Sequence, residues 1–99
     1  MRLLAIDEDN GVTECEITSE VDDFLKAVND TCDDEYTIAD FLEDAQKEAE
    51  ITLSLVDLVE KGMLSCDNPD GLREHKELAE DSLKTIEVLR GRATELGYL

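Results

Sequence analysis

The longest periodic pattern of the chain lies between Thr37 and Met63, where apolar or small side chains recur at alternating steps of four and three. This spacing places them on one side of an α-helix. The members of this seam are Ile38, Leu42, Ala45, Ala49, Thr52, Val56, Val59 and Met63. Thr37 and Asp40 have the spacing of a capping box, and Gly62 is placed to end the helix in a left-handed conformation. The pattern predicts a central helix over residues 38–61.

The second half of this helix carries a further apolar row beside the seam, formed by Ile51, Leu55 and Leu58. A helix that is apolar on more than half of its circumference must be covered from two sides. The first helix, an N-terminal hairpin and a second copy of the protein are the three candidate covers. A homodimer is therefore one of the arrangements that the pattern allows.

A second long pattern predicts a helix over residues 69–96. Asn68, Pro69 and Asp70 suit the N-cap, the first helical position and the first turn, and Gly97 suits the C-terminal end. Its seam is Leu72, Ala79, Leu83, Ile86, Leu89, Ala93 and Leu96, with His75 on the same side. Two helices of similar length joined by a short loop are expected to pack antiparallel at a shallow angle.

The N-terminal residues 1–18 have the pattern of a β-hairpin. A short β-prone run precedes the turn residues Asp7 to Gly11, and the following residues alternate between apolar and polar. Asn10-Gly11 is a hairpin signal because both residues tolerate a positive φ. We prefer this interpretation to a calcium loop, because the twelfth position counted from Asp7 is Thr18 and not Glu. An isolated hairpin is barely stable in water, so this one should lie on the helices.

A shorter helix is expected over residues 20–31, with Ser19 and Asp22 spaced as a capping pair. Its apolar stripe is Val21, Phe24, Leu25, Val28 and Cys32. The sequence thus predicts a mainly α (α+β) fold in one domain, 1–99, with an N-terminal β-hairpin and three helices. The last two helices form a long antiparallel helical hairpin.

The net charge of −18 changes the functional picture, because it is distributed unevenly. Residues 7–60 hold 19 acids against two bases, whereas residues 61–99 hold eight acids against six bases. Such a chain repels nucleic acid and anionic membranes, which are bound through Lys and Arg. Adaptation to a salt-rich cytoplasm should spread acids over the whole surface, whereas a surface built for a basic partner should concentrate them. The distribution favours the second explanation.

Ten acids of the first helix, the following linker and the central helix are the candidate partner-binding residues. They are Asp22, Asp23, Asp30, Asp33, Asp34, Glu35, Asp40, Glu43, Asp44 and Glu50. Glu43 and Glu50 are about 10 Å apart along the helix, on a scale loosely comparable to the phosphates of a duplex. This array suggests a protein that mimics DNA.

Motifs for chemistry are missing from the sequence. The common nucleotide-binding and hydrolase signatures do not occur, and His75 is the single histidine, so we expect no catalytic residues, no cofactor and no metal. The chain has no run of about 18 apolar residues for a membrane span and no signal peptide. Three cysteines, Cys15, Cys32 and Cys66, form no CxxC pair, which favours a reducing cytoplasm and small, buried thiols.

Residues 37–64 resemble part of a known family. TIADFLEDA followed by ITLSLVDLVEKGML is similar to the second and third helices of a winged helix-turn-helix, mainly through the ending from Leu58 to Leu64. Where that family has a turn, this chain has the helix-forming residues Gln46 to Glu50. The resemblance implies a regulatory domain that binds protein rather than DNA, since the matching recognition helix lacks basic residues before Lys61.

The expectation from the sequence is a small, non-enzymatic, cytoplasmic protein that binds a basic surface of a larger protein. A DNA-mimicking inhibitor of the kind that phages direct against host nucleases or defence complexes fits this description. The alternative is a winged-helix-like or helical-bundle regulatory domain from a salt-adapted organism, in which the acids serve solubility.

Overall fold

The computed structural model describes residues 1–7 and 11–99, including the side chains of residues 1–4 and 15–99. Its elements, in chain order, are β1 (Arg2–Asp7), β2 (Gly11–Glu16), α1 (Val21–Thr31), α2 (Ile38–Glu60) and α3 (Pro69–Glu95). The two strands pair antiparallel, from Arg2 opposite Glu16 to Asp7 opposite Gly11. The predicted fold class is confirmed. The predicted turn at residues 8–10 lies outside the described residues.

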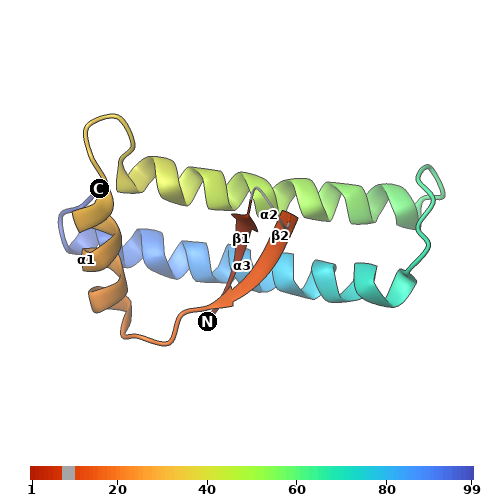
Figure 1. The fold of residues 1–99 in the computed structure, drawn as a ribbon, viewed down its shortest axis with the longest axis horizontal. Coiled ribbons are helices and arrows are strands. Elements are labelled where there is room, and N and C mark those ends of the chain that lie inside the picture. The colour runs from red at the N-terminus through yellow and green to blue at the C-terminus, as the bar shows by residue number, and fades with distance from the viewer. Residues whose placement is uncertain (8–10) are drawn as a thin grey trace.

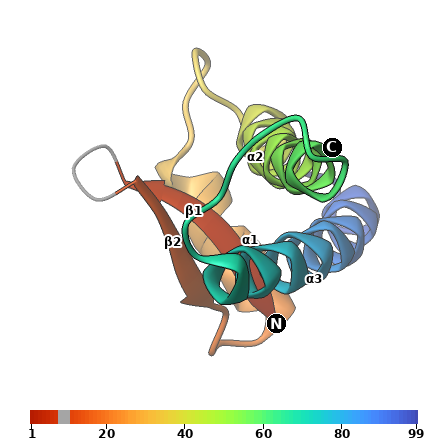
Figure 2. The same cartoon turned by 90° about the vertical axis from the view of Figure 1, so that its right-hand side faces the viewer.

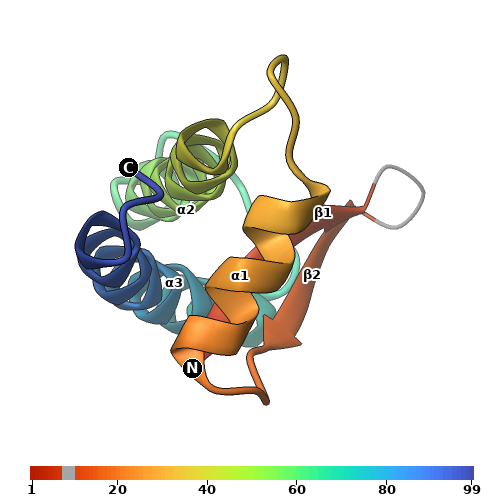
Figure 3. The same cartoon turned by 90° about the vertical axis from the view of Figure 1, so that its left-hand side faces the viewer.

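The molecule has two layers (Figures 1 and 2). One layer is the antiparallel pair α2 and α3, which run side by side over their whole length. The other contains the β-hairpin, which crosses the middle of this pair, and α1, which crosses the end where α2 begins and α3 finishes (Figure 3). The half of the helical pair near the 61–68 loop extends beyond both covering elements.

The ends of the two long helices follow the predicted capping chemistry. Thr37 Oγ1 accepts a hydrogen bond from Asp40 N, and Asp40 accepts one from Thr37 N, which is a complete capping box. Asn68 Oδ1 accepts from Gly71 N at 3.0 Å. At Gly62, which has φ +76°, the Gly62 and Met63 amides donate to carbonyls of the last turn and end α2 in a Schellman motif.

The predicted cap of α1 is wrong. Glu20, not Ser19, occupies the N-cap position in extended conformation, and its side chain makes no capping hydrogen bond. Ser19 lies one residue too early for its hydroxyl to reach the free amides of the first turn. The helix is held instead by Leu25, which is buried against Ile38, Leu42, Leu89 and Ala93.

Five members of the α2 seam are buried as predicted: Ile38, Leu42, Ala45, Ala49 and Val56. Thr52 and Val59 are half-buried, and Met63 is 73% exposed. The Schellman motif ends the helix before Met63, so this side chain leaves the helical face. On the predicted apolar side of α3, His75 near the start of the helix and Leu96 just after its end are also exposed. His75 Nδ1 lies 2.8 Å from the Gly71 carbonyl, within its own helix.

A second buried side of α3, which the sequence pattern did not predict, receives the hairpin. Because the sheet has two strands, the edge of β1 away from β2 has free backbone groups. Leu4 N donates to Ser82 Oγ at 3.1 Å, and Thr85 Oγ1 donates to the Arg2 carbonyl at 2.7 Å. The Arg2 guanidinium also pairs with Asp81. Two hydroxyls of α3 thus satisfy the backbone of β1 where a third strand would otherwise do so.

The position of the hairpin explains why the predicted burial of Cys15 is wrong. β1 packs on the helices, whereas β2 is the outer strand, and Cys15 on β2 is exposed. Cys32 packs against the core while remaining partly exposed, and Cys66 is also partly exposed. None of the three is a fully buried thiol.

The apolar row beside the α2 seam is not covered within one chain. Ile51 is 52% exposed and Leu55 is 47% exposed, while Leu58 is half-buried. Of the three candidate covers, α1 crosses the opposite end of the helical pair, and the hairpin crosses its middle but leaves Ile51 and Leu55 exposed (Figure 1). α2 is also continuous through Gln46–Glu50, so the turn of a winged helix-turn-helix is not present.

Candidate functional site: an acidic surface

The ten predicted acids come from three consecutive parts of the chain: α1, the 32–37 linker and residues 40–50 of α2. α1, the linker and the start of α2 lie at one end of the molecule (Figure 3). We call these ten residues, as named above, the acidic surface. Nine of them are exposed, and Asp40 is half-buried. A folded scaffold therefore holds these carboxylates in water.

The linker contributes a defined turn to this surface. Asp33 Oδ1 accepts from the amides of Glu35 and Tyr36 at 2.9 and 2.8 Å, as in an Asx-turn. The Tyr36 hydroxyl then donates to Asp44 Oδ2 at 2.8 Å, which ties the linker to α2. Partial burial and this hydrogen bond to Asp44 raise the pKa of Tyr36 to about 12. Asp33 and Asp44 thus position the linker through their side-chain hydrogen bonds.

Asp40 has a structural role in this arrangement. It belongs to the capping box of α2, where its carboxylate accepts from both the amide and the hydroxyl of Thr37. A carboxylate in the first turn is also favoured by the helix dipole. Its charge adds to the acidic surface, but its hydrogen bonds are occupied by the helix start.

Two of the ten acids are paired with cations. Arg92 of α3 donates two hydrogen bonds of 2.6 and 2.8 Å to the Asp22 carboxylate, and the same guanidinium donates one of 2.6 Å to Glu95. The bonds from Arg92 hold the pKa of Asp22 below its ordinary value, and they raise the pKa of Arg92. Glu43 lies 3.5 Å from Lys47 on the same helix.

The other eight carboxylates have no cation within 4.0 Å among the described residues. They are Asp23, Asp30, Asp33, Asp34, Glu35, Asp40, Asp44 and Glu50. Two bases of α3 are bonded to other residues: Arg90 donates to Gln46, and Lys76 pairs with Glu60. The charge count along the sequence identifies the acids, but it cannot identify Arg92 as a partner from 70 residues away.

A small groove of about 260 Å³ borders the acidic surface between the hairpin and α2. Its lining residues are Leu3, Leu4, Tyr36, Phe41, Asp44, Ala45 and Glu48. Asp44 and Tyr36 belong to both the groove and the linker contact. An apolar contact site therefore lies directly beside the charged one.

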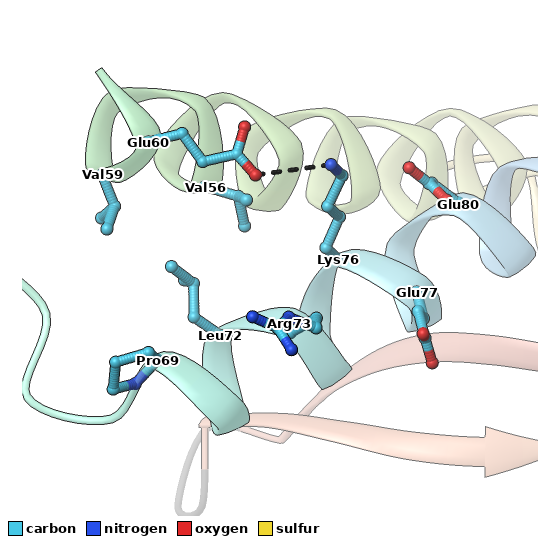
Figure 4. Close-up of a pocket in the computed structure, with 9 residues that line it drawn as sticks. All are labelled: Val56, Val59, Glu60, Pro69, Leu72, Arg73, Lys76, Glu77 and Glu80. Atoms are coloured by element: carbon cyan, nitrogen blue, oxygen red, sulfur yellow. Dashed lines mark hydrogen bonds and ion pairs between the residues drawn. The ribbon is translucent and has the colours of Figure 1, made fainter. Parts of the chain in front are cut away.

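A larger groove, of about 490 Å³, lies far from these acids, between the second half of α2 and the start of α3 (Figure 4). Val56, Val59 and Leu72 form its apolar part, and Lys76 reaches across it to Glu60 at 3.4 Å. Its lining contains no Ser, Cys or His, so it offers no nucleophile with a neighbouring base.

Within the described part of the chain, no group of three or more His, Cys, Asp or Glu side chains is arranged to hold a metal ion. No helix in that part is both long and apolar enough to cross a membrane. Comparison with protein families, with characterised proteins and with solved structures finds no match to this chain. The interpretation of the acidic surface therefore depends on its own geometry.

Proposed function

We propose that the acidic surface binds a basic, nucleic-acid-binding surface of a larger protein and excludes DNA from it. The observation that supports this proposal is the set of eight carboxylates, on α1, the linker and residues 40–50 of α2, that have no cation within 4.0 Å among the described residues. Of the ten acids, only Asp22 and Glu43 have a cation within 4.0 Å among the described residues. A partner rich in Lys and Arg would supply the missing counter-charges.

Inhibition would proceed by occlusion. Carboxylates would occupy the Lys and Arg side chains that otherwise hold phosphates, with rapid association that is weakened by salt. The apolar groove beside Tyr36 and Asp44 would then slow dissociation, because buried apolar contacts contribute much of the residence time of a complex. The protein would act in the cytoplasm of the cell that contains its target, as phage inhibitors of host nucleases or defence complexes do.

The test is a pull-down from a host lysate with the protein as bait, challenged with duplex DNA and with rising salt. Competition by DNA and loss of the complex between 0.1 and 1 M salt are expected. At 1 M salt the Debye length is about 3 Å, so exposed charge pairs attract each other only weakly. A complex indifferent to both challenges would contradict DNA mimicry.

The alternative, a helical-bundle regulatory domain whose acids serve solubility in salt, makes a different prediction. Circular dichroism in low and multimolar salt separates the two. A helical structure that forms in low salt supports an acidic surface available for binding, whereas folding only in multimolar salt would favour the alternative.

A further inference from the structure

The exposed apolar row of α2 lies in the part of the molecule where charge is lowest. Ile51, Leu55 and Leu58 follow one another at helical spacing on one side of α2, and residues 51–56 carry no charged side chain. The hairpin crosses the middle of the helical pair, and the part of α2 near the 61–68 loop extends beyond it (Figure 1). An apolar surface of this kind on a strongly charged protein is typical of an interaction site.

We infer that this row is the contact between two copies of the chain, packed with their α2 helices antiparallel about a two-fold axis between Ser54 and Leu55. In such a contact residue i of one copy faces residue 109 − i of the other, since a two-fold axis makes the pairing reciprocal. Ile51 then faces Leu58 of the second copy, and Leu55 packs beside the axis. The row that one chain leaves exposed thereby becomes buried.

The charges of α2 are self-complementary in this register. Glu48, which has no cation within 4.0 Å among the described residues, faces Lys61 of the second copy. Lys61 bonds Asp57 of its own helix at 2.8 Å and has further N–H donors available. Asp57 faces Thr52, and Glu60 points toward α3 of its own chain, where it pairs with Lys76 (Figure 4).

Repulsion between two chains of charge −18 also selects the antiparallel arrangement. Five of the seven acids of α2 precede the apolar row: Asp40, Glu43, Asp44, Glu48 and Glu50. An antiparallel contact carries the two sets of five to opposite sides of the two-fold axis. A parallel contact would place Asp44 and Glu48 opposite their own copies, which is unfavourable. A basic partner protein would find no complementary charge on this row, because the row itself presents no carboxylates.

The contact is limited to about four turns of each helix, so it belongs to the small, reversible class of interfaces, with a dissociation constant on the order of micromolar. The dimer would carry two acidic surfaces pointing away from each other. This inference does not depend on the proposed function, because a monomeric variant keeps its acidic surface and its partner.

Sedimentation equilibrium of the full chain from 1 to 200 μM, in a reducing buffer, tests the inference. The wild type is expected to shift from monomer to dimer over this range. Leu55→Glu should raise the dissociation constant by about 100-fold or more, because it buries two charges at the axis in place of two apolar side chains. The matched control is Val88→Glu on α3, where a valine is 51% exposed away from the row, and it should leave the equilibrium unchanged.

The register has its own test, which does not rely on the stability of the Leu55 variant. Lys61→Glu and Glu48→Lys alone should each weaken the dimer about 10-fold, and the double variant should restore it, because the pair is exchanged across the axis. A wild type that stays monomeric at 200 μM, or equal weakening by Val88→Glu, would overturn the dimer. A double variant weaker than either single variant would overturn the antiparallel register.

Discussion

Ser82 provides one of the two hydroxyls that bind β1 to α3, and removal of this buried hydroxyl is the sharpest test of the fold. Ser82 is completely buried, and its Oγ accepts the amide of Leu4, which is itself 2% exposed. In Ser82→Ala this amide loses its partner and no water replaces it in the packed interface. We expect Ser82→Ala to lower the free energy of unfolding and to weaken the contact between the hairpin and α3.

The magnitude combines two contributions. The net value of a hydrogen bond is about 1 kcal/mol, and a buried amide without a partner costs about 1–3 kcal/mol, so we expect a loss of about 2 kcal/mol in the free energy of unfolding. For a domain of this size that loss corresponds to a fall of about 10 °C in Tm. Urea unfolding followed by circular dichroism at 222 nm measures it, at a protein concentration held constant across variants.

Thr94→Ala is the matched control. Like Ser82, Thr94 bonds the backbone through its hydroxyl, here as a donor to the Arg90 carbonyl, but it lies on the exposed side of α3. Alanine is a better helix former than threonine, so Thr94→Ala should change the free energy of unfolding by no more than about 0.5 kcal/mol. If Ser82→Ala cost no more than Thr94→Ala, the hydroxyl would not anchor the hairpin and this account of β1 would be refuted.

Three further predictions concern the acidic surface and the end of α2. Alkaline titration of tyrosine absorbance should show a pKa of about 12 for the Tyr36 phenol, and Asp44→Asn should lower this pKa. The stability that this phenol contributes is present below pH 10 and is lost between pH 10 and 12. Arg92→Gln should raise the carboxyl pKa of Asp22 toward 3.8 in an NMR titration; the wild-type pair stabilises the fold above about pH 4 and loses this contribution as the pH falls through the lowered pKa. Gly62→Ala should cost about 1 kcal/mol in urea unfolding, because its φ of +76° is unfavourable for a residue with a Cβ atom.

Local patterns predicted the elements of this fold closely. Predicted bounds of 20–31, 38–61 and 69–96 differ by one residue at one end of each helix from the observed bounds. Periodicity and capping chemistry act within a few residues of the chain, so they can be read from the sequence. The Gly62 cap and the Thr37–Asp40 box are of this kind.

The errors concern contacts between distant parts of the chain. Ser82 and Thr85 look like polar residues on a solvent face, and their burial follows only from the position of β1, about 80 residues earlier in the chain. The partner of Asp22 could not be predicted for the same reason. The acidic surface itself was predictable because the distribution of charge is a property of the sequence. That eight of its acids have no cation nearby among the described residues could be seen only in the structure.

The central claim is that the acidic surface, and not the total charge, binds the partner. The most direct measurement compares two variants with the same change of charge in the pull-down. One replaces Asp23, Asp30, Asp34 and Glu50 of the acidic surface with Lys, and the other replaces Glu74, Glu77, Glu80 and Glu87, which are exposed on α3. With both variants shown to be folded, the first should weaken the complex by about 100-fold or more and the second by less than about 10-fold. Equal losses, or no loss in the first variant, would contradict the claim.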